Sequence, residues 1–177
     1  MMMYSLAVLT PVTLPTLRAT PSAVRALVEG IPEEVRQAAP LPEANAGDWG
    51  MSTVVAHLID GHRRQVGRIR LMVEQDNPVL QNADEWEAML ASGLLGRPTE
   101  ELLATFEECR AADVPWYEGL SDTDLGRTGV HSLGGEVTVA NILNHAAYHD
   151  AQHLGQVARL IEVAAHAGRG NMGLVDV

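Results

Sequence analysis

Cysteine is nearly absent from the sequence, since Cys109 is the only one among its 177 residues. A single thiol excludes an internal disulfide and a thiolate cluster as a metal site. A lone cysteine in a helix is most often a small buried apolar residue, and we interpret Cys109 in this way. Disulfide-stabilised and cysteine-based metal folds are therefore excluded.

Lysine is absent altogether, so all 12 basic residues are arginine, against 23 acidic residues and a formal net charge of −11. Such a surface repels phosphate backbones, whereas sequence-independent binding of nucleic acid needs a cationic stripe. The nearest candidate is one short run inside a predicted helix, made of Arg63, Arg64, Arg68 and Arg70. We therefore expect no nucleic-acid partner.

Long hydrophobic runs are also missing, because no apolar stretch reaches the roughly 20 residues that cross a bilayer. Residues 1–13 are apolar, but no basic residue precedes Arg18, and Pro11 and Pro15 interrupt the segment. The charged start that is typical of a secretion signal is thus lacking. We expect a cytoplasmic protein with no membrane partner.

Aliphatic side chains must form the core, since 46% of the residues are hydrophobic but only 4% are aromatic. The length suits one domain rather than two. We predict a single domain over 1–177, with its core at about 20–166. The N-terminal lead 1–19 and the glycine-rich tail 167–177 are predicted to be peripheral.

Hydrophobic periodicity and capping signals predict four principal helices, at about 20–28, 51–75, 99–117 and 137–166. Thr20 would cap the first of them, with Pro21 at its first helical position. Shorter features are extra turns over 31–37, a loop over 38–49, a short helix at 84–91 and a turn or hairpin over 122–136. No run of strands is convincing. The pattern favours an all-α, antiparallel, up-and-down four-helix bundle.

Two histidines of the last predicted helix, His149 and His153, are four residues apart. Residues at this spacing are neighbours on one helix face, so both imidazoles can reach a single ion. They lie on the apolar stripe that a bundle helix turns inward. Buried imidazoles need partners for their nitrogens, and a shared metal would supply one for each ring. Hydrogen-bonded core histidines remain an equal alternative on this spacing alone.

The second predicted helix also contains two histidines, His57 and His62, which lie on different faces of the helix. His57 lies on a polar face with Asp60 and Arg64, whereas His62 lies on the apolar face nearly opposite. Periodicity therefore predicts that His62 is buried and His57 is exposed. Placing His57 at an internal site requires that both faces of this helix are covered, for which a contact in a homodimer would suffice.

Two segments of the chain together resemble a known family. The first contains Trp49, His57, Asp60, Arg68, Arg70, Glu74, Asp76, Asn77, Pro78, Asp84 and Trp86; the second contains Thr138, Val139, Ala140, Asn141, Asn144, His145, His149, His153 and Gln156. In this combination the chain resembles the DinB-like (DinB/YfiT) superfamily of metal-dependent bundle proteins. The resemblance covers most of residues 20–165, with little of it in the first helix.

The resemblance implies an up-and-down four-helix bundle that often dimerises and binds a metal through one histidine of its second helix and two of its last. Residue by residue, it implies His57, His149 and His153 as the metal ligands, with His145 outside the triad. Many relatives have glutamate where this chain has His62. This departure puts an acid-base role of that position in doubt but leaves the ligand set whole.

Three imidazoles suit zinc, our first choice, and also nickel, iron or manganese. Three protein ligands leave coordination positions open, as in catalytic rather than structural sites. Such a metal can activate water or a thiolate. The resemblance implies activation of a thiolate, because characterised relatives include transferases and isomerases that use low-molecular-weight thiols.

We therefore predict a metal-dependent enzyme, a thiol-dependent S-transferase or isomerase that detoxifies small electrophiles. The alternative is a noncatalytic, stress-associated dimeric bundle that binds a metal or a small ligand. Hydrolysis is a third option, but it needs a general base, for which Asp60 and Asp150 are weak candidates.

The residues around the triad each have a plain structural interpretation. Asp60 could be a base, but an ion pair with Arg63 or Arg64 is the better expectation. Arg64 and Arg68 could bind an anionic thiol or a substrate carboxylate, or form ordinary ion pairs. Other neighbours are assigned more simply: Tyr148, Gln152 and Gln156 to the pocket wall or helix packing, Trp49 to the start of its helix, and His131 and His166 to the surface.

Overall fold

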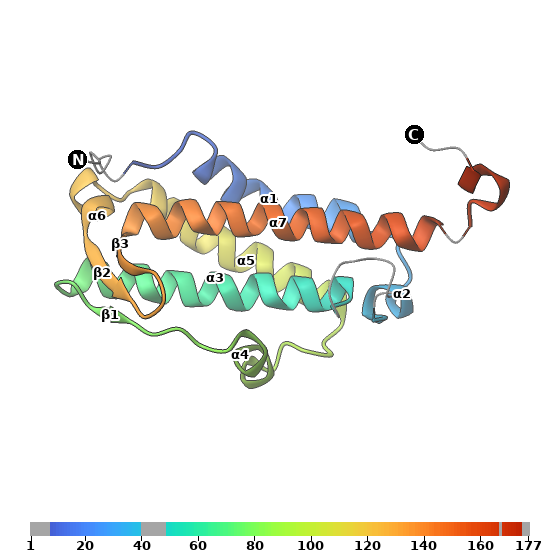
Figure 1. Cartoon of the computed structure of the whole chain (residues 1–177), viewed down its shortest axis with the longest axis horizontal. Helices are drawn as coiled ribbons and strands as arrows, with labels where there is room; N and C mark the ends of the chain where they lie inside the picture. The colour runs from blue at the N-terminus through green and yellow to red at the C-terminus, as the bar shows by residue number, and fades with distance from the viewer. Residues whose placement is uncertain (1–7, 40–48, 167, 175–177) are drawn as a thin grey trace.

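The computed structural model describes residues 8–39, 49–166 and 168–174. Four long helices form the body of the molecule (Figure 1): α1 (Thr13–Val28), α3 (Met51–Glu74), α5 (Thr99–Glu118) and α7 (Val139–His166). The predicted all-α four-helix bundle is confirmed. The predictions for residues 1–7, most of the 38–49 loop, and residues 167 and 175–177 lie outside the described residues.

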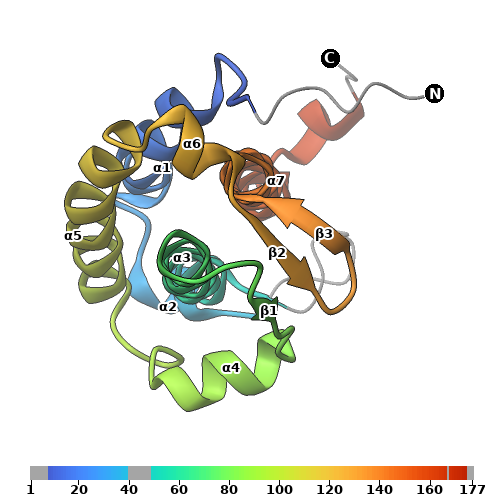
Figure 2. The same cartoon turned by 90° about the vertical axis from the view of Figure 1, so that its left-hand side faces the viewer.

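The four helices do not alternate in direction along the chain, so the predicted antiparallel up-and-down path is corrected within the confirmed bundle. Arg25, near the end of α1, pairs with Glu100 at the start of α5, so these two helices are antiparallel. Ser52 and Thr99, at the starts of α3 and α5, are hydrogen-bonded, so those two are parallel. Each long helix thus has one parallel and one antiparallel neighbour, and α1 and α3 lie on opposite corners (Figure 2).

Short elements connect the long helices. They are α2 (Glu33–Gln37), β1 (Val79–Leu80), α4 (Glu85–Ser92), α6 (Asp122–Gly126), β2 (Thr128–His131), β3 (Gly135–Thr138) and the 3₁₀ helix η2 (Gly170–Leu174). β2 pairs with β3 as an antiparallel hairpin, and β1 adds to β2 in parallel. The short helix and the hairpin were expected, whereas the expectation of no strand run misses this small sheet.

The predicted start of the first helix at Thr20 is wrong, because α1 begins at Thr13 and buries Leu17 completely. Pro21 lies inside the helix instead of opening it. A proline there leaves the carbonyl four residues earlier without its helical donor. Arg110 of α5 donates to that carbonyl, on Leu17, from 3.3 Å. A tertiary contact thus compensates for the proline, and no local sequence signal could reveal it.

α3 is buried on both of its faces within a single chain. α5 and α7 pack along it, while α2 and α4 contact it from other sides (Figure 2). His57 and His62 are both almost fully buried, at 1% and 2% exposure. The prediction that His57 would be exposed is therefore wrong. Elements of one chain cover α3, so the burial of His57 no longer supports a homodimer. The homodimer stays a prediction.

Among the described residues, no helix combines the length and the apolar character needed to cross a membrane.

Candidate metal centre

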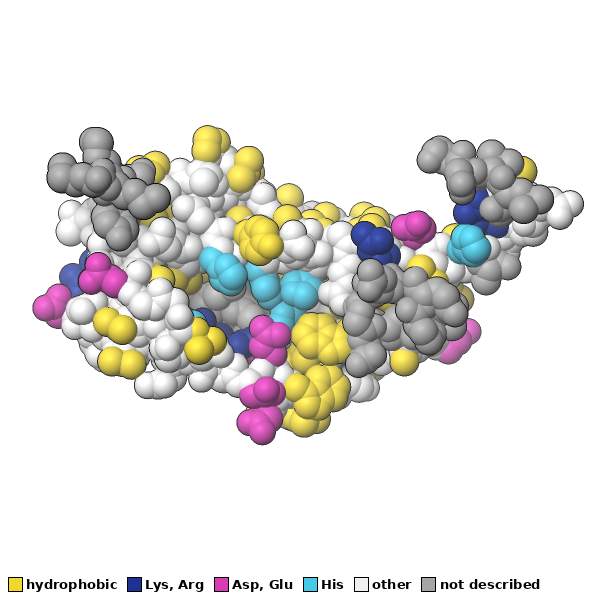
Figure 3. Space-filling model, in the orientation of Figure 1, with side chains coloured by type: hydrophobic (Ala, Val, Ile, Leu, Met, Phe, Trp, Pro, Cys, Tyr) yellow, Lys and Arg dark blue, Asp and Glu magenta, His cyan; other side chains and the backbone are white. Residues whose placement is uncertain are grey.

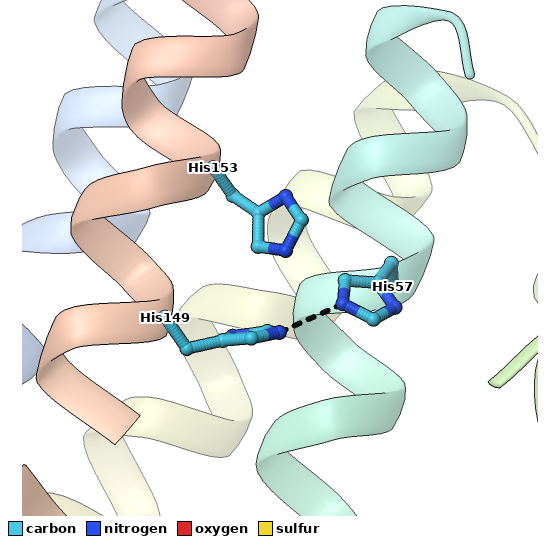
Figure 4. A group of neighbouring side chains, drawn as sticks. All are labelled: His57, His149 and His153. Carbon is cyan, nitrogen blue, oxygen red and sulfur yellow. Dashed lines mark hydrogen bonds between the residues drawn. The ribbon is translucent and has the colours of Figure 1, made fainter. Parts of the chain in front are cut away.

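Three histidines from two antiparallel helices converge between α3 and α7 (Figure 4). His57 extends from α3 toward α7, and His149 and His153 extend from successive turns of α7 toward α3. One nitrogen from each ring lies within 4.8 Å of the other two. His57 is buried, whereas His149 and His153 are partly exposed. The structure thus brings together the predicted triad, which is open to solvent on the α7 side.

The donor set fits a divalent ion. Nε2 of His57 and Nε2 of His149 lie 2.7 Å apart, which in neutral rings is a hydrogen bond. Two nitrogens bound tetrahedrally to one zinc ion stand about 3.3 Å apart, given Zn–N bonds of about 2.0–2.1 Å. The pair would therefore open by about half an ångström on binding a metal. Such a change lies within the reach of side-chain rotation alone.

Burial keeps the rings of His57 and His149 neutral, which is the form that binds metal. It lowers the pKa of His57 to about 3, with smaller contributions from His153 and Arg64. The pKa of His149 is lowered to about 3 for the same reason, aided by His153 and His57. Nδ1 of His57 is buried without a hydrogen-bond partner among the described residues, so nothing there stabilises an imidazolium.

Gln156 orients the third ring. Nδ1 of His153 lies 2.7 Å from the side-chain oxygen Oε1 of Gln156, one helical turn further along α7. A carbonyl oxygen only accepts, so Nδ1 carries the proton and Nε2 keeps its lone pair. An acceptor on the outer nitrogen is the usual support of a metal-binding histidine. The sequence placed Gln156 at the pocket without assigning this role.

Two further residues shape the site and were not predicted to do so. A Cβ atom on Gly61 of α3 would lie 3.3 Å from Cε1 of His149, so glycine allows that ring to approach the helix. The Trp49 ring lies 4.7 Å from the His57 ring and 6.3 Å from the His153 ring, centroid to centroid. Trp49 therefore walls the triad rather than only starting its helix.

A buried ion pair holds α7 in the rotation that the site requires. Arg110 of α5 donates to Asp150 at 2.8 Å, and both side chains are almost fully buried. Burial raises the pKa of Asp150, while Arg110 and Thr20 act in the opposite direction. Because Asp150 faces α5, the preceding residue His149 and its neighbour His153 face α3.

His62 belongs to a separate polar contact on the other side of α3. Its Nε2 lies 3.0 Å from Oδ2 of Asp113 in α5. Burial, with Arg110, lowers the pKa of His62 to about 4, although Asp113 opposes this shift. The expectation that His62 cannot share an ion with His57 agrees with this placement.

The polar residues that the sequence placed near the triad differ in whether they form ion pairs. Asp60 pairs with Arg64 at 2.9 Å, as the plain interpretation expected. Arg68 donates to the backbone carbonyl of Gln81 and forms no ion pair with a described carboxylate. Tyr148 is exposed beside His145.

Histidine side chains run across the hollowed middle of one face, with arginine recessed beside them (Figure 3). His145 lies next to the triad, its ring 6.3 Å from that of His149. His131, expected at the surface, instead lines a cavity together with His145.

Comparisons with known proteins agree with this architecture. A profile of the DinB superfamily matches residues 16–157, well over half of the chain. A protein of Oceanobacillus iheyensis, named "Putative metal-dependent hydrolase", is 28% identical over 117 residues, which are 65% of this chain and 66% of that protein. One of Bacillus mycoides with the same description is 25% identical over 118 residues, 66% of each chain. The chain thus spans just under two thirds of the length of these curated relatives.

A solved structure shows the same fold. YfiT from Bacillus subtilis, described as "a probable metal-dependent hydrolase with an unusual four-helix bundle topology", superposes with a TM-score of 0.74 at 20% identity. The match covers 91% of this chain and 86% of that one. The match to the family profile over most of its length shows that the chain belongs to the DinB superfamily.

Proposed function

We propose that this chain is a divalent-metal-dependent enzyme whose metal is held by His57, His149 and His153. The observation that carries the proposal is the convergence of three imidazole nitrogens from two helices within 4.8 Å. Zinc is the first choice, and nickel, iron and manganese also accept imidazole ligands. When bound, such an ion supplies a Lewis acid with open coordination positions.

The reaction we propose is the transfer of a low-molecular-weight thiol to a small electrophile, or an isomerisation that uses such a thiol. Support comes from the carboxylates near the triad, since Asp60 pairs with Arg64 and Asp150 pairs with Arg110. Neither is free to act as a strong base. A thiol ionises near pH 8.5 and needs less help from a base than water does. The reducing cytoplasm, which keeps such thiols available, is the proposed location.

Hydrolysis is the second candidate, because the relatives from Oceanobacillus and Bacillus are named metal-dependent hydrolases. His145 would then be the base that activates water, since it is exposed and its ring lies 6.3 Å from that of His149. Its substitution therefore separates the two reactions. His145→Ala should abolish hydrolysis but leave thiol transfer largely intact.

Metal binding is tested by elemental analysis of the purified chain beside a His57→Ala, His153→Ala double variant. His166→Ala is the matched control, since this histidine is exposed at the end of α7. The wild type and the control should each hold about one metal ion per chain, and the double variant should hold almost none. Equal metal in all three proteins would refute the triad.

Activity is tested on metal-loaded protein with two assays. Conjugation of cysteine to 1-chloro-2,4-dinitrobenzene reports thiol transfer, and release of 4-nitrophenol from its acetate ester reports hydrolysis. Thiol transfer that is lost in His149→Ala supports the enzyme proposed. A metal-loaded protein that is inactive in both assays, with several thiols, would instead favour a noncatalytic, stress-associated binding bundle.

A further inference from the structure

A cavity of about 420 Å³ lies beside the triad, between α3, α7 and the β2–β3 hairpin. Its walls include Arg68 from α3, His131 from β2, and Asn141 and His145 from α7. The His145 ring lines the cavity and lies 6.3 Å from that of His149, so the cavity and the metal centre are neighbours. It therefore lies where part of a molecule bound at the triad would extend.

Arg68 brings an uncompensated positive charge to this cavity. On the same helix, Arg64 pairs with Asp60 and Arg70 pairs with Asp113, but no described carboxylate pairs with Arg68. Of the five donors of its guanidinium, one reaches the carbonyl of Gln81. Arg127 is likewise partly buried without a described carboxylate partner, but its guanidinium reaches two backbone carbonyls, whereas that of Arg68 reaches one.

The other polar groups of the cavity also present donors. Nδ1 of His131 accepts from the backbone amides of Leu133 and Gly134, so in the neutral ring Nε2 carries the proton. Burial, together with Arg68 and His145, lowers the pKa of His131 and favours that neutral form. The side-chain oxygen of Asn141 accepts from the amide of Thr138, which leaves its NH₂ group as the donor. Together with Arg68, these donors favour an anion, and the amide of Gln65, which also lines the cavity, offers one further donor group beside its acceptor oxygen.

Most of the remaining lining is apolar and favours a ligand with an apolar body. Leu133, Val137 and Ile142 contribute aliphatic surface to the same cavity. Gly61 lies against His149, and Arg68 follows it by seven residues, or about 10 Å along the helix at 1.5 Å per residue. A molecule anchored at Arg68 would thus need a body of about 10 Å to reach the triad.

We propose that this cavity binds the carboxylate of a small amphipathic molecule, with Arg68 as its anchor. The inference rests on the proposed function, because it assigns the substrate of that site to the class of carboxylates with an apolar body. The carboxylate lies at Arg68, and the reacting end lies at the triad.

The probe for this test is 4-phenylbutyrate, compared with its neutral amide, in isothermal titrations of the full chain. Both metal-loaded protein and protein freed of metal and chelator are used. The carboxylate should bind to both forms, and at least tenfold more tightly than the amide. This preference in the wild type tests the inference without relying on the folding of any variant.

Arg68→Gln should weaken binding of the carboxylate at least tenfold and leave that of the amide unchanged. Arg63→Gln is the matched control, because this arginine of the same helix is exposed, and it should bind as the wild type does. Equal binding of the two probes, or carboxylate binding that ignores Arg68, would overturn the inference. No detectable binding of the carboxylate at millimolar concentration would overturn it as well.

The two proposals fail separately. If the His57→Ala, His153→Ala variant keeps its metal, the triad is wrong, while Arg68-dependent binding by metal-free protein would still stand. If carboxylate binding requires the metal but not Arg68, the probe binds at the triad and the anion subsite is wrong.

Discussion

Gly61→Ala should weaken metal binding, although alanine favours the helix more than glycine does. The new Cβ would lie 3.3 Å from Cε1 and 3.9 Å from Nε2 of His149. Carbon atoms in ordinary contact are about 3.5–4.0 Å apart, so the ring must retreat by a few tenths of an ångström. The new Cβ would restrict the rotation by which the rings of His57 and His149 open to admit an ion. We therefore expect at least about a tenfold loss of zinc affinity, or about 1.4 kcal/mol.

Gly67→Ala is the matched control on the same helix, because its Cβ would meet no described atom within 4 Å. Alanine is preferred to glycine inside a helix by about 0.8–1.0 kcal/mol. Chemical unfolding of the metal-free proteins should show that full gain for Gly67→Ala and a smaller gain, or none, for Gly61→Ala. Zinc titration should show wild-type affinity for Gly67→Ala. Full affinity together with the full gain in Gly61→Ala would refute the close approach.

Four further predictions follow from the site and its supports. Asp150→Asn leaves Arg110 buried without a charge partner and should lower the free energy of unfolding by about 3–5 kcal/mol, whereas pairing Arg110→Met with Asp150→Leu should recover most of it; urea unfolding measures both. Gln156→Leu removes the acceptor of His153 and should weaken zinc binding about tenfold to hundredfold, while Gln152→Leu, exposed on the same helix, should not. Two histidines of the triad have a pKa lowered from 6.5 to about 3, so below pH 6.5 the unfolded chain takes up protons that the folded chain does not. The stability of the metal-free protein should accordingly fall from pH 6.5 toward pH 4, and equal unfolding midpoints at pH 7 and pH 5 would contradict this. The homodimer is checked by sedimentation, in which a monomer at micromolar concentration would contradict it.

The histidine triad shows what spacing can and cannot predict. His149 and His153 follow from a four-residue spacing on an inward stripe, which is local information. His57 does not, because periodicity favoured His62, and the helix is in fact covered on both faces. Only the family resemblance selected His57, since the packing that buries it comes from elements far away in the sequence.

The fold shows a similar division between local and tertiary information. The ends of α3, α4, α5 and α7 lie within one or two residues of their predicted positions because caps, prolines and glycines mark them locally. The start of α1 was missed because Arg110, distant in sequence, satisfies the carbonyl that Pro21 leaves free. The contacts of Gly61 and Trp49 with the histidines are likewise tertiary. No pattern in their own segments indicated them.

The central claim is that one divalent ion is held by three imidazoles from two helices. Anomalous diffraction from crystals of the zinc-loaded protein tests it most directly. The account predicts a single peak between α3 and α7, about 2.0–2.1 Å from one nitrogen each of His57, His149 and His153. A metal peak elsewhere in the bundle, or one that touches fewer than three of these rings, would contradict it.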